Sequence, residues 1–445
     1  MKMFGRALPA LCTSVVLIAG GLASAQTPEP PATASGKTAA ETRIEELERR
    51  VRELESRLLE LEGARAGRPP TVPGEPAAAA QPTPAATAAP STSYAEQSPV
   101  SQTGPISGYM DFHFNRPEHE DARLDFHRFV LLFNHSFSDR LRFVGELELE
   151  HAFVEGLEPS GELELEQAYL DFKVNRAFNI RAGMLLAPVG IINERHEPPS
   201  FHGVERPFVD TFIVPSTWFD AGAGVHGTLG AGWQYRAYLM APLDATRITA
   251  DEGLAEARQK GFVSNVRDVA QTGRLEYVGF PGLNLGASFW RGKTGFNFRR
   301  VDSRVGVAEF DGRYHAGPFA IRGEFAQVFV DGAAELNDVV QRTAGVNPNI
   351  ARQMRGFYVE PSIRPLPRIR HDIAAFMRYE NFDTQFRMPA GVNALKQFDR
   401  AAWVFGGSYF PDPDVVLKID YSIIRNRSSL FRSVDGLNIG LGWWF

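Results

Sequence analysis

Apolar and polar residues alternate along the chain from about residue 105 onward, in short segments that are separated by turn residues. In 141–150, for example, apolar or small residues occupy the odd positions, and charged residues occupy most of the even ones. A period of two is typical of a β-strand with one apolar face. Most segments have about the 9–11 residues with which a tilted strand crosses a bilayer. We delimit sixteen segments: 105–115, 123–134, 140–152, 162–174, 178–186, 219–229, 232–241, 272–280, 284–290, 306–316, 318–330, 355–363, 370–381, 400–410, 414–424 and 435–445.

The connections between these segments alternate in length. Every second one is short and rich in turn residues: 136–139, 175–178, 227–232, 280–283, 315–318, 365–368 and 411–414. The others are longer and include 187–218, 242–271, 330–354 and 382–399. Short turns on one side, long loops on the other and an even strand number are typical of outer-membrane barrels, whereas a soluble sandwich has no reason to separate loops by length. The pattern therefore predicts an all-β fold, a 16-stranded antiparallel transmembrane β-barrel over 105–445.

The alternation also assigns the two faces of the predicted barrel. A charged side chain that faces lipid at the middle of a bilayer costs about 2–4 kcal/mol, so the charged parity should face the lumen. Several strands then bring acids and arginines together on one face, which favours a water-filled channel. The residues predicted to line it and to set its selectivity are Arg142, Glu146, Glu148, Glu150, Arg274, Glu276, Glu309, Arg313, Arg322, Glu324, Arg378, Glu380, Lys418 and Asp420.

Two segments do not fit a simple alternation. In 162–174, Glu162, Glu164 and Glu166 share a parity with Leu170 and Phe172, so this strand needs a bulge or a slip. Segment 123–134 is apolar on both faces. Two explanations stay open for it: a contact between subunits, or a loop that covers it from inside the barrel.

The last predicted strand, 435–445, must pair with the first one to leave no open edge in lipid. Its parity directs Leu437, Ile439 and Leu441 toward lipid and Asn438 inward. The final aromatic residues would lie in the periplasmic aromatic girdle. A terminal Phe also resembles the signal that the outer-membrane assembly machinery recognises, so Phe445 is the predicted contact with that machinery.

The first 104 residues differ in character from the rest. Residues 1–25 have a basic start, an apolar stretch and the sequence Ala-Ser-Ala, which predicts a cleaved signal peptide. Residues 26–40 are predicted to be disordered, and 63–104, rich in Ala and Pro, to form a linker.

Residues 41–62 show a heptad pattern that predicts a parallel coiled coil. Arg and Glu recur at the flanking positions of three heptads, as in the trimerisation motif of three-stranded coiled coils. A solvated single helix with ion pairs four residues apart is the alternative. The predicted core positions, and hence the trimerisation residues, are Ile44, Leu47, Val51, Leu54, Leu58 and Leu61.

Composition and charge narrow the chemistry. The formal net charge is −6, with no basic excess that would favour nucleic acid, and the one cysteine, Cys12, excludes an internal disulfide or a cysteine-based metal site. GAGVHG at 222–227 satisfies a dinucleotide-binding pattern, but no helix-forming stretch follows it. Neither His196 with His202 nor His113 with His119 has a spacing that would converge on a metal, and nothing marks a nucleophile. We therefore expect no enzyme activity, no cofactor and no metal.

Three stretches resemble the phosphate-selective porin O and P family of trimeric, 16-stranded outer-membrane channels: RAGMLLAPVG at 181–190, FMRYENFD at 376–383 and GGSYFPDPDVVLKIDY at 406–421. The resemblance covers roughly 105–445 and implies a homotrimer in outer-membrane lipid. In trimeric porins the third long loop commonly folds into the lumen. Here that loop is 187–218, and its candidate constriction residues are Arg195, His196, His202 and Arg206. The alternative is an extracellular loop whose charges are solvated.

The predicted function is a passive diffusion channel for small hydrophilic solutes or ions in the bacterial outer membrane, with the coiled coil in the periplasm. Of the 47 basic and 53 acidic residues, 10 and 11 precede residue 105, which leaves 37 basic and 42 acidic groups, a mixture unlike an anion trap. One alternative is a substrate-specific channel for phosphate, other anions, dicarboxylates or sugars. Another is a structural tether between the outer membrane and the cell wall.

Overall fold

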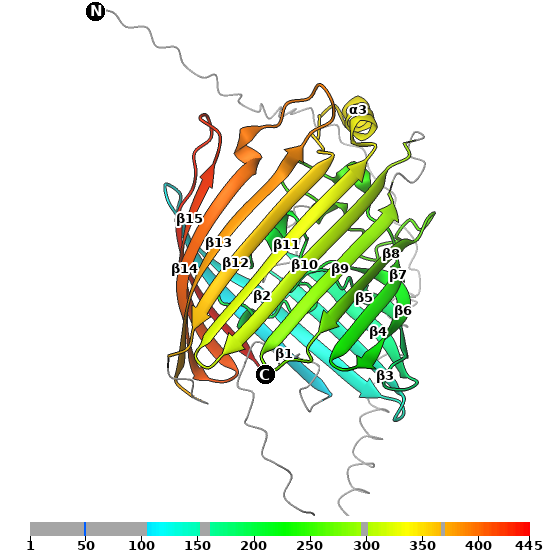
Figure 1. Cartoon of the computed structure of the whole chain (residues 1–445), viewed down its shortest axis with the longest axis vertical. Coiled ribbons are helices and arrows are strands. Elements are labelled where there is room, and N and C mark those ends of the chain that lie inside the picture. Colours follow the sequence, from blue (N-terminus) through cyan, green and yellow to red (C-terminus); the bar gives the residue numbers. More distant parts are fainter. Residues whose placement is uncertain (1–48, 50–104, 152–160, 295–300, 366–369) are drawn as a thin grey trace, which may run out of the picture. The chain divides into compact units, whose positions relative to one another are not determined.

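The computed structural model describes Arg49 and residues 105–151, 161–294, 301–365 and 370–445. The strands between residues 106 and 444 form a closed β-barrel (Figure 1). The predicted signal peptide, disordered segment, coiled coil and linker lie outside the described residues, apart from Arg49. The strands are β1 (Ile106–Pro117), β2 (Arg123–Ser136), β3 (Leu141–Glu150), β4 (Glu162–Lys173), β5 (Asn179–Leu186), β6 (Phe219–Gly230), β7 (Trp233–Met240), β8 (Ala270–Tyr277), β9 (Leu283–Lys293), β10 (Arg304–Ala316), β11 (Phe319–Asp331), β12 (Gln353–Ile363), β13 (Asp372–Arg387), β14 (Asp399–Asp412), β15 (Val415–Asn426) and β16 (Gly436–Trp444). The helices are η3 (Pro198–Ser200), α2 (Val209–Phe212), η4 (Ala245–Arg247), η5 (Ala255–Ala257), α3 (Ala333–Ala344) and η7 (Lys396–Phe398).

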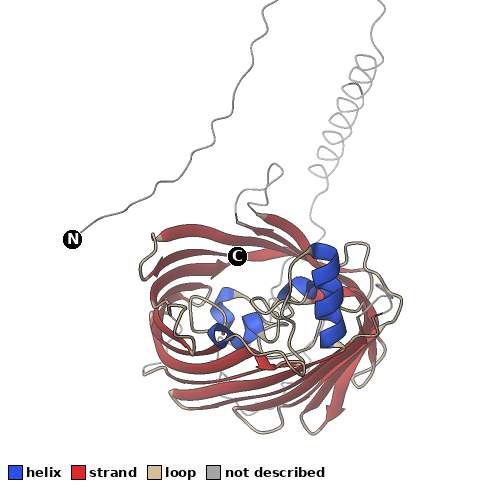
Figure 2. Ribbon diagram, turned by 90° about the horizontal axis from the view of Figure 1, so that it is seen from above, coloured by secondary structure: helices blue, strands red, loops and turns tan. Residues whose placement is uncertain are grey.

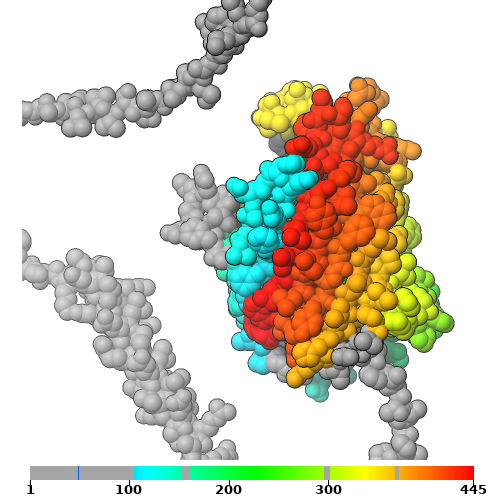
Figure 3. Space-filling model, turned by 90° about the vertical axis from the view of Figure 1, so that its left-hand side faces the viewer, coloured from blue at the N-terminus to red at the C-terminus, as the bar shows by residue number. Residues whose placement is uncertain are grey.

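Each strand pairs antiparallel with its neighbours in sequence, and β16 pairs with β1 to close the barrel. The closing register runs from Tyr109 opposite Trp444 to Pro117 opposite Gly436, and Figure 3 shows the first strands (cyan) lying beside the last ones (red). All sixteen predicted strands are confirmed, with ends shifted by a few residues. Among the described residues, no helix is both long enough and apolar enough to cross a membrane.

The connections separate by length as the sequence predicts. Those that follow the even-numbered strands have two to eight residues, and the one after β6 holds only two, Ala231 and Gly232, both with positive φ. Those that follow the odd-numbered strands include the two longest, 187–218 and 241–269. Because consecutive strands are antiparallel, all connections of one kind lie at the same end. We call these the short-turn end and the long-loop end.

The barrel has apolar residues outside and charged residues inside. On β15, Leu417, Ile419 and Tyr421 are exposed, whereas Lys418 and Asp420 between them are buried. The same contrast recurs around the barrel, where the outer face carries most of the exposed large hydrophobic side chains and the inner face most of the buried charges. This inverted distribution is the one that a lipid environment favours.

Both irregular segments have a structural explanation. The β3–β4 register shifts after Glu146, so that Glu166 is an extra residue on β4. Because of this extra residue, the alternation on each side of it fits the barrel. The predicted bulge is confirmed. On β2, the inward Val130 and Leu132 are buried against Tyr109 and Trp444. Tyr109 in turn meets the ring of His196, from loop 187–218, edge-on with centroids 6.4 Å apart. Through Tyr109, the loop reaches this apolar cluster from inside the barrel, which favours a covering loop over a contact between subunits for the inner face.

The long connections fill much of the barrel. Figure 2 shows short helices and loops inside the ring of strands. Apolar residues of 187–218, of 241–257 and of α3 form one buried cluster with inward residues of the wall, among them Ile213, Leu254, Leu336 and Trp290. The cavities therefore occupy only part of the interior, and protein covers much of the charged inner face that the sequence predicts to line a water-filled channel.

Candidate functional site: the interior of the barrel

All fourteen residues predicted to face the lumen lie on inward positions of their strands. Arg142, Glu150 and Arg313 are half-buried, and the other eleven are buried. Several of them contact loop 187–218 or one another, so a position on the inner wall does not by itself give contact with solvent. Which of them contact a passing solute stays a prediction.

One group of charges lies on β7, β8 and β10. The guanidinium of Arg274 forms ion pairs with Glu276 at 3.1 Å, with Glu309 at 3.3 Å and with Asp311 at 2.6 Å. Arg236 approaches the other oxygen of Glu276 at 2.6 Å. Buried charges persist only when they are paired and hydrogen-bonded, and here one arginine serves three carboxylates.

A second group lies on β11, β12 and β13 and is centred on Glu360. This carboxylate is fully buried and pairs with Arg322 at 2.7 Å and with Arg378 at 3.0 Å. It also pairs with the ring of His202, at 2.6 Å from Nδ1. Arg378 donates in addition to Glu380 at 2.6 Å. Two arginines and two glutamates of the wall thus hold a histidine of the loop.

Loop 187–218 is anchored to the wall through its backbone. Three of its backbone N–H groups donate to wall carboxylates: Ile191 to Glu324 at 3.2 Å, Val204 to Asp420 at 2.6 Å and Val209 to Glu380 at 3.0 Å. The ammonium of Lys418 donates to the carbonyl oxygens of Phe201 and Gly203 at 2.8 and 2.7 Å. Hydrogen bonds to charged groups are about twice as strong as neutral ones. The loop is therefore a fixed part of the interior, and the alternative of a solvated extracellular loop is wrong.

The four candidate constriction residues have different surroundings. His196 is buried between Glu166 at 3.1 Å and Glu146 at 3.7 Å, and His202 is bound to Glu360. Arg206 donates to Ser216 at 3.0 Å within the loop. Arg195 and His196 both line a cavity of about 260 Å³, and His202 lines a smaller one of about 90 Å³.

The hollow side of the interior is the wall of β3 to β7. A cavity of about 520 Å³ lies at its short-turn end, with Arg142, Asp171, Lys173, Arg181 and His226 in its wall. A second cavity of about 260 Å³ lies further in, where Glu194, Arg195, Glu197 and Arg236 join Arg142 and Arg181. Arg142 and Arg181 line both cavities. We call the opposite wall, β8 to β15 under loop 187–218, the filled side.

Sequence reasoning missed several residues of this interior, although their parity marks them. Arg181 and Arg236 occupy inward positions on β5 and β7, and Glu360 does so on β12. Arg181 donates to Asp171 at 2.8 Å, and Arg236 pairs with Glu194 of the loop at 3.2 Å. The alternation could have found each of them, but it could not show which wall stays hollow.

Solved structures with this arrangement are outer-membrane channels. OmpF of Salmonella typhi, solved as a complex with daunomycin, matches with a TM-score of 0.52 and 13% identity over 76% of this chain and 97% of that chain. The outer membrane channel DcaP of Acinetobacter baumannii matches with a TM-score of 0.52 and 14% identity over 76% and 96%. The anion-selective porin of Comamonas acidovorans matches with a TM-score of 0.50 and 12% identity over 76% and 98%. The chain thus has the fold of the 16-stranded outer-membrane porins.

A relative in sequence places the chain more narrowly. The chain is 33% identical over 355 residues to a protein of Aquifex aeolicus (strain VF5) that carries the name "Uncharacterized protein"; the match covers 76% of this chain and 79% of the relative. The chain belongs to the family of this Aquifex protein. No family model matches the sequence.

Proposed function

We propose that the protein is an outer-membrane porin through which small hydrophilic solutes diffuse passively. The observation that carries the proposal is a closed barrel with an apolar outer face, a charged interior and a hollow side next to an anchored inner loop. A structural tether would need only the apolar outer face that anchors the barrel in lipid. An arginine-lined hollow inside the barrel, in contrast, provides a path for polar solutes. The outer-membrane channels that share the fold support the same function.

We further propose that the channel prefers anions. The larger cavity is lined by four basic and two acidic residues. The basic ones are Arg142, Lys173 and Arg181 on strands and Arg140 on a turn, and the acidic ones are Asp139 and Asp171. The smaller cavity has four arginines against Glu194 and Glu197. A narrow, low-dielectric space lined mostly by one sign of charge raises the local concentration of the opposite ion. The whole barrel is slightly acidic, but several of its acids are paired with arginines on the filled side, among them Glu309, Asp311 and Glu360.

The finer features are proposals as well. The heptads of 41–62 support a homotrimer with a periplasmic coiled coil, and the three stretches that resemble the phosphate-selective porin O and P family support the same assembly. Exposure of Phe445, which stacks on Phe129 with centroids 5.8 Å apart, is compatible with recognition by the assembly machinery. The hollow holds a single lysine among its basic residues, which favours small anions in general over phosphate alone.

The test is conductance of the purified, folded protein in a planar bilayer, followed by its reversal potential in a potassium chloride gradient. We expect ohmic current steps, and a potential whose sign shows that chloride is more permeant than potassium. Folded protein that inserts without conducting would refute the channel and favour the tether. A potential of the opposite sign would refute the anion preference alone.

A further inference from the structure

Three side chains with metal-ligating atoms converge inside the barrel at the long-loop end, away from the hollow side. The first of them, His127, owes its position to a bulge in β2. Asp111 on β1 pairs with Arg128, but the next pair is Phe112 with Phe126, so His127 is an extra residue. A bulge re-aims the side chain of the extra residue. The imidazole of His127 accordingly lies inside the barrel, stacked on that of His113 at 4.4 Å and 14°.

The second residue, His151, lies directly across from His127 on the neighbouring strand. The β2–β3 register ends with Arg128 opposite Glu150, and the N–H of His151 then donates to the carbonyl oxygen of His127 at 2.9 Å. His151 has a φ of 50°, in the left-handed region that non-glycine residues rarely adopt. The two imidazoles are nearly perpendicular, with centroids 5.7 Å apart.

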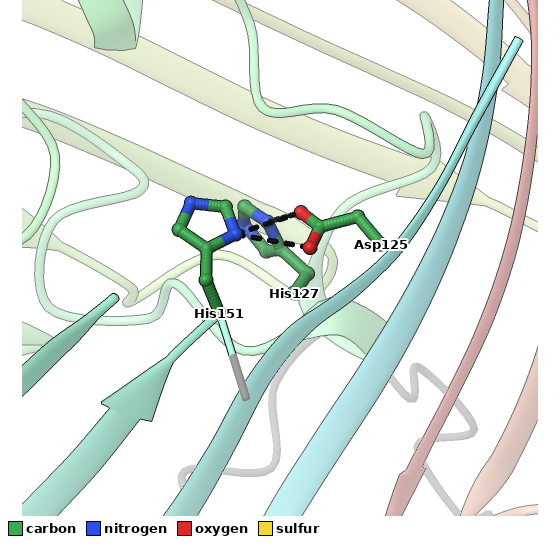
Figure 4. A group of neighbouring side chains, drawn as sticks. All are labelled: Asp125, His127 and His151. Carbon is green, nitrogen blue, oxygen red and sulfur yellow. Dashed lines mark hydrogen bonds and ion pairs between the residues drawn. The ribbon is translucent and has the colours of Figure 1, made fainter. Parts of the chain in front are cut away.

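The third residue is Asp125, whose carboxylate faces the Nδ1 atom of each of the two imidazoles (Figure 4). Its Oδ2 is 2.9 Å from Nδ1 of His151 and 3.4 Å from Nδ1 of His127. Each of the three residues offers one possible metal-ligand atom, and these three atoms lie within 4.8 Å of one another. Ligands of a tetrahedral zinc ion, at bonds of about 2.0–2.2 Å, are separated by about 3.3 Å, so an ion fits after small rotations of these side chains.

The neighbouring groups hold His127 in place without competing for the ion. His113, which stacks on His127, already has both ring nitrogens engaged: Nε2 with Asp111 at 3.1 Å and Nδ1 with Glu205 of loop 187–218 at 3.0 Å. Arg128 is bound to Asp111 at 3.3 Å. A ring that is fixed by stacking loses less freedom when it binds a metal.

We propose that Asp125, His127 and His151 bind one divalent transition-metal ion per chain, with Zn²⁺ as the representative ion. Two imidazole nitrogens and one carboxylate oxygen suit zinc, cobalt or nickel, whereas Ca²⁺ and Mg²⁺ require oxygen ligands. The side chains are 32%, 20% and 46% exposed, so the ion can enter from solvent and can keep a water as its fourth ligand. The site lies apart from the two cavities of the hollow side, and its existence does not depend on conduction by the barrel.

The competing explanation is a trio that is complete without an ion, in which both histidines donate to Asp125. A histidine in an ordinary ion pair contacts one carboxylate and shares it with no second imidazole. His119 illustrates the simple case, since its ring lies 3.8 Å from Glu118 alone and is 54% exposed. His119 is therefore the matched control for the proposed ligands.

The experiment uses the folded full-length protein without an affinity tag, after treatment with EDTA. Co²⁺ is added as a spectroscopic probe, and the visible absorption of a low-symmetry cobalt site is followed; Zn²⁺ is then added to displace it. We expect one Co²⁺ per chain, displaced by an equal amount of Zn²⁺ and not by Ca²⁺. His151→Ala and Asp125→Asn should each weaken Zn²⁺ binding by at least about tenfold, since even supporting groups matter by that much. His119→Ala should leave it unchanged.

His127→Gln is a further variant that retains the size and polarity of the side chain. Heat-modified mobility on gels checks that every variant is folded. Absence of stoichiometric Co²⁺ or Zn²⁺ binding by folded wild-type protein would overturn the proposal. So would binding that survives all three substitutions, because the ion would then lie elsewhere, for example at the buried group of Glu146, Glu166 and His196.

Discussion

The hollow side and the filled side of this barrel are built from the same kind of strand. Both have an apolar outer face and an inner face with charges of both signs. On the hollow side, Arg142 and Arg181 line both cavities. On the filled side, Arg322 and Arg378 are buried and hold a loop through Glu360 and His202.

The difference teaches that inward charges have two separate uses. Where a loop lies over the wall, its backbone N–H groups and its histidines replace water as partners of the carboxylates. On the hollow side, the loop contributes Glu194, Arg195 and Glu197 to the lining of a cavity and leaves open space beside the charges of the wall. A charged inner face therefore predicts a polar partner, which is either the protein's own loop or the solvent. Mutations on the two sides should consequently differ in kind: stability on one, ion selectivity on the other.

The largest effect is expected from Arg378→Ala on the filled side. The variant leaves Glu380 without its cation and Glu360 with Arg322 and His202 only. An uncompensated buried charge costs about 3–5 kcal/mol of the free energy of unfolding. Urea unfolding of the folded protein in lipid vesicles, followed by tryptophan fluorescence, measures it.

The control for Arg378→Ala is Arg425→Ala at the exposed rim. Arg425 pairs with Asp435, but its side chain is 58% exposed, and exposed pairs contribute about 0–1 kcal/mol. Equal losses in the two variants would contradict the view that the filled side is a buried network.

The second prediction concerns selectivity on the hollow side. Arg195→Glu reverses a charge that lines the inner cavity. A unit charge about 4 Å from an ion is worth about 1 kcal/mol in water, so the chloride-to-potassium permeability ratio should fall several-fold. The reversal potential in a salt gradient measures it. Arg427→Glu, at a 75% exposed position outside the cavities, should leave the potential unchanged. An unchanged potential in Arg195→Glu would place the selectivity elsewhere.

A smaller effect is expected when one loop anchor loses its charge. Asp420→Asn keeps an acceptor for the N–H of Val204 and a partner for Asn438, but the bonds are no longer charge-assisted. We expect a loss of about 1–2 kcal/mol in urea unfolding. A gain in stability would show that burying the charge of Asp420 costs more than these bonds return.

The smallest effect is expected at the rim, outside the strands, where the hydrogen bond from Arg425 lowers the pKa of Asp435. A carboxyl whose pKa is lowered by folding stabilises the fold above its ordinary pKa of about 3.9, and this contribution disappears as the pH falls through the lowered value. Hydrogen exchange of residues 427–435 should therefore rise as the pH falls below about 4, once the intrinsic rate is corrected. Arg425→Ala should already show the faster exchange at pH 7. Exchange that is independent of pH in wild type would contradict this role.

The sequence by itself determined the number of strands, their order, the faces of most strands and the two classes of connection. The reason is that strand periodicity and lipid exposure act locally: each outward position must be apolar whatever the rest of the chain does. Even the bulge near Glu166 followed from a conflict of parity. The hairpin turn at 137–140 also fixes the register that places His127 opposite His151, so this pair was predictable from the sequence, although we did not predict it.

Only the tertiary structure decided how the interior is divided. Loop 187–218 could lie over any part of the wall, and the choice depends on the fit of many partners that are distant in sequence, such as Ile191 with Glu324 and Val204 with Asp420. The same holds for the convergence of Asp125 with two imidazoles, which needs a bulge in β2 that the alternation of 123–134 does not reveal. Contacts across the barrel depend on three-dimensional fit, and periodicity along one strand carries no information about it.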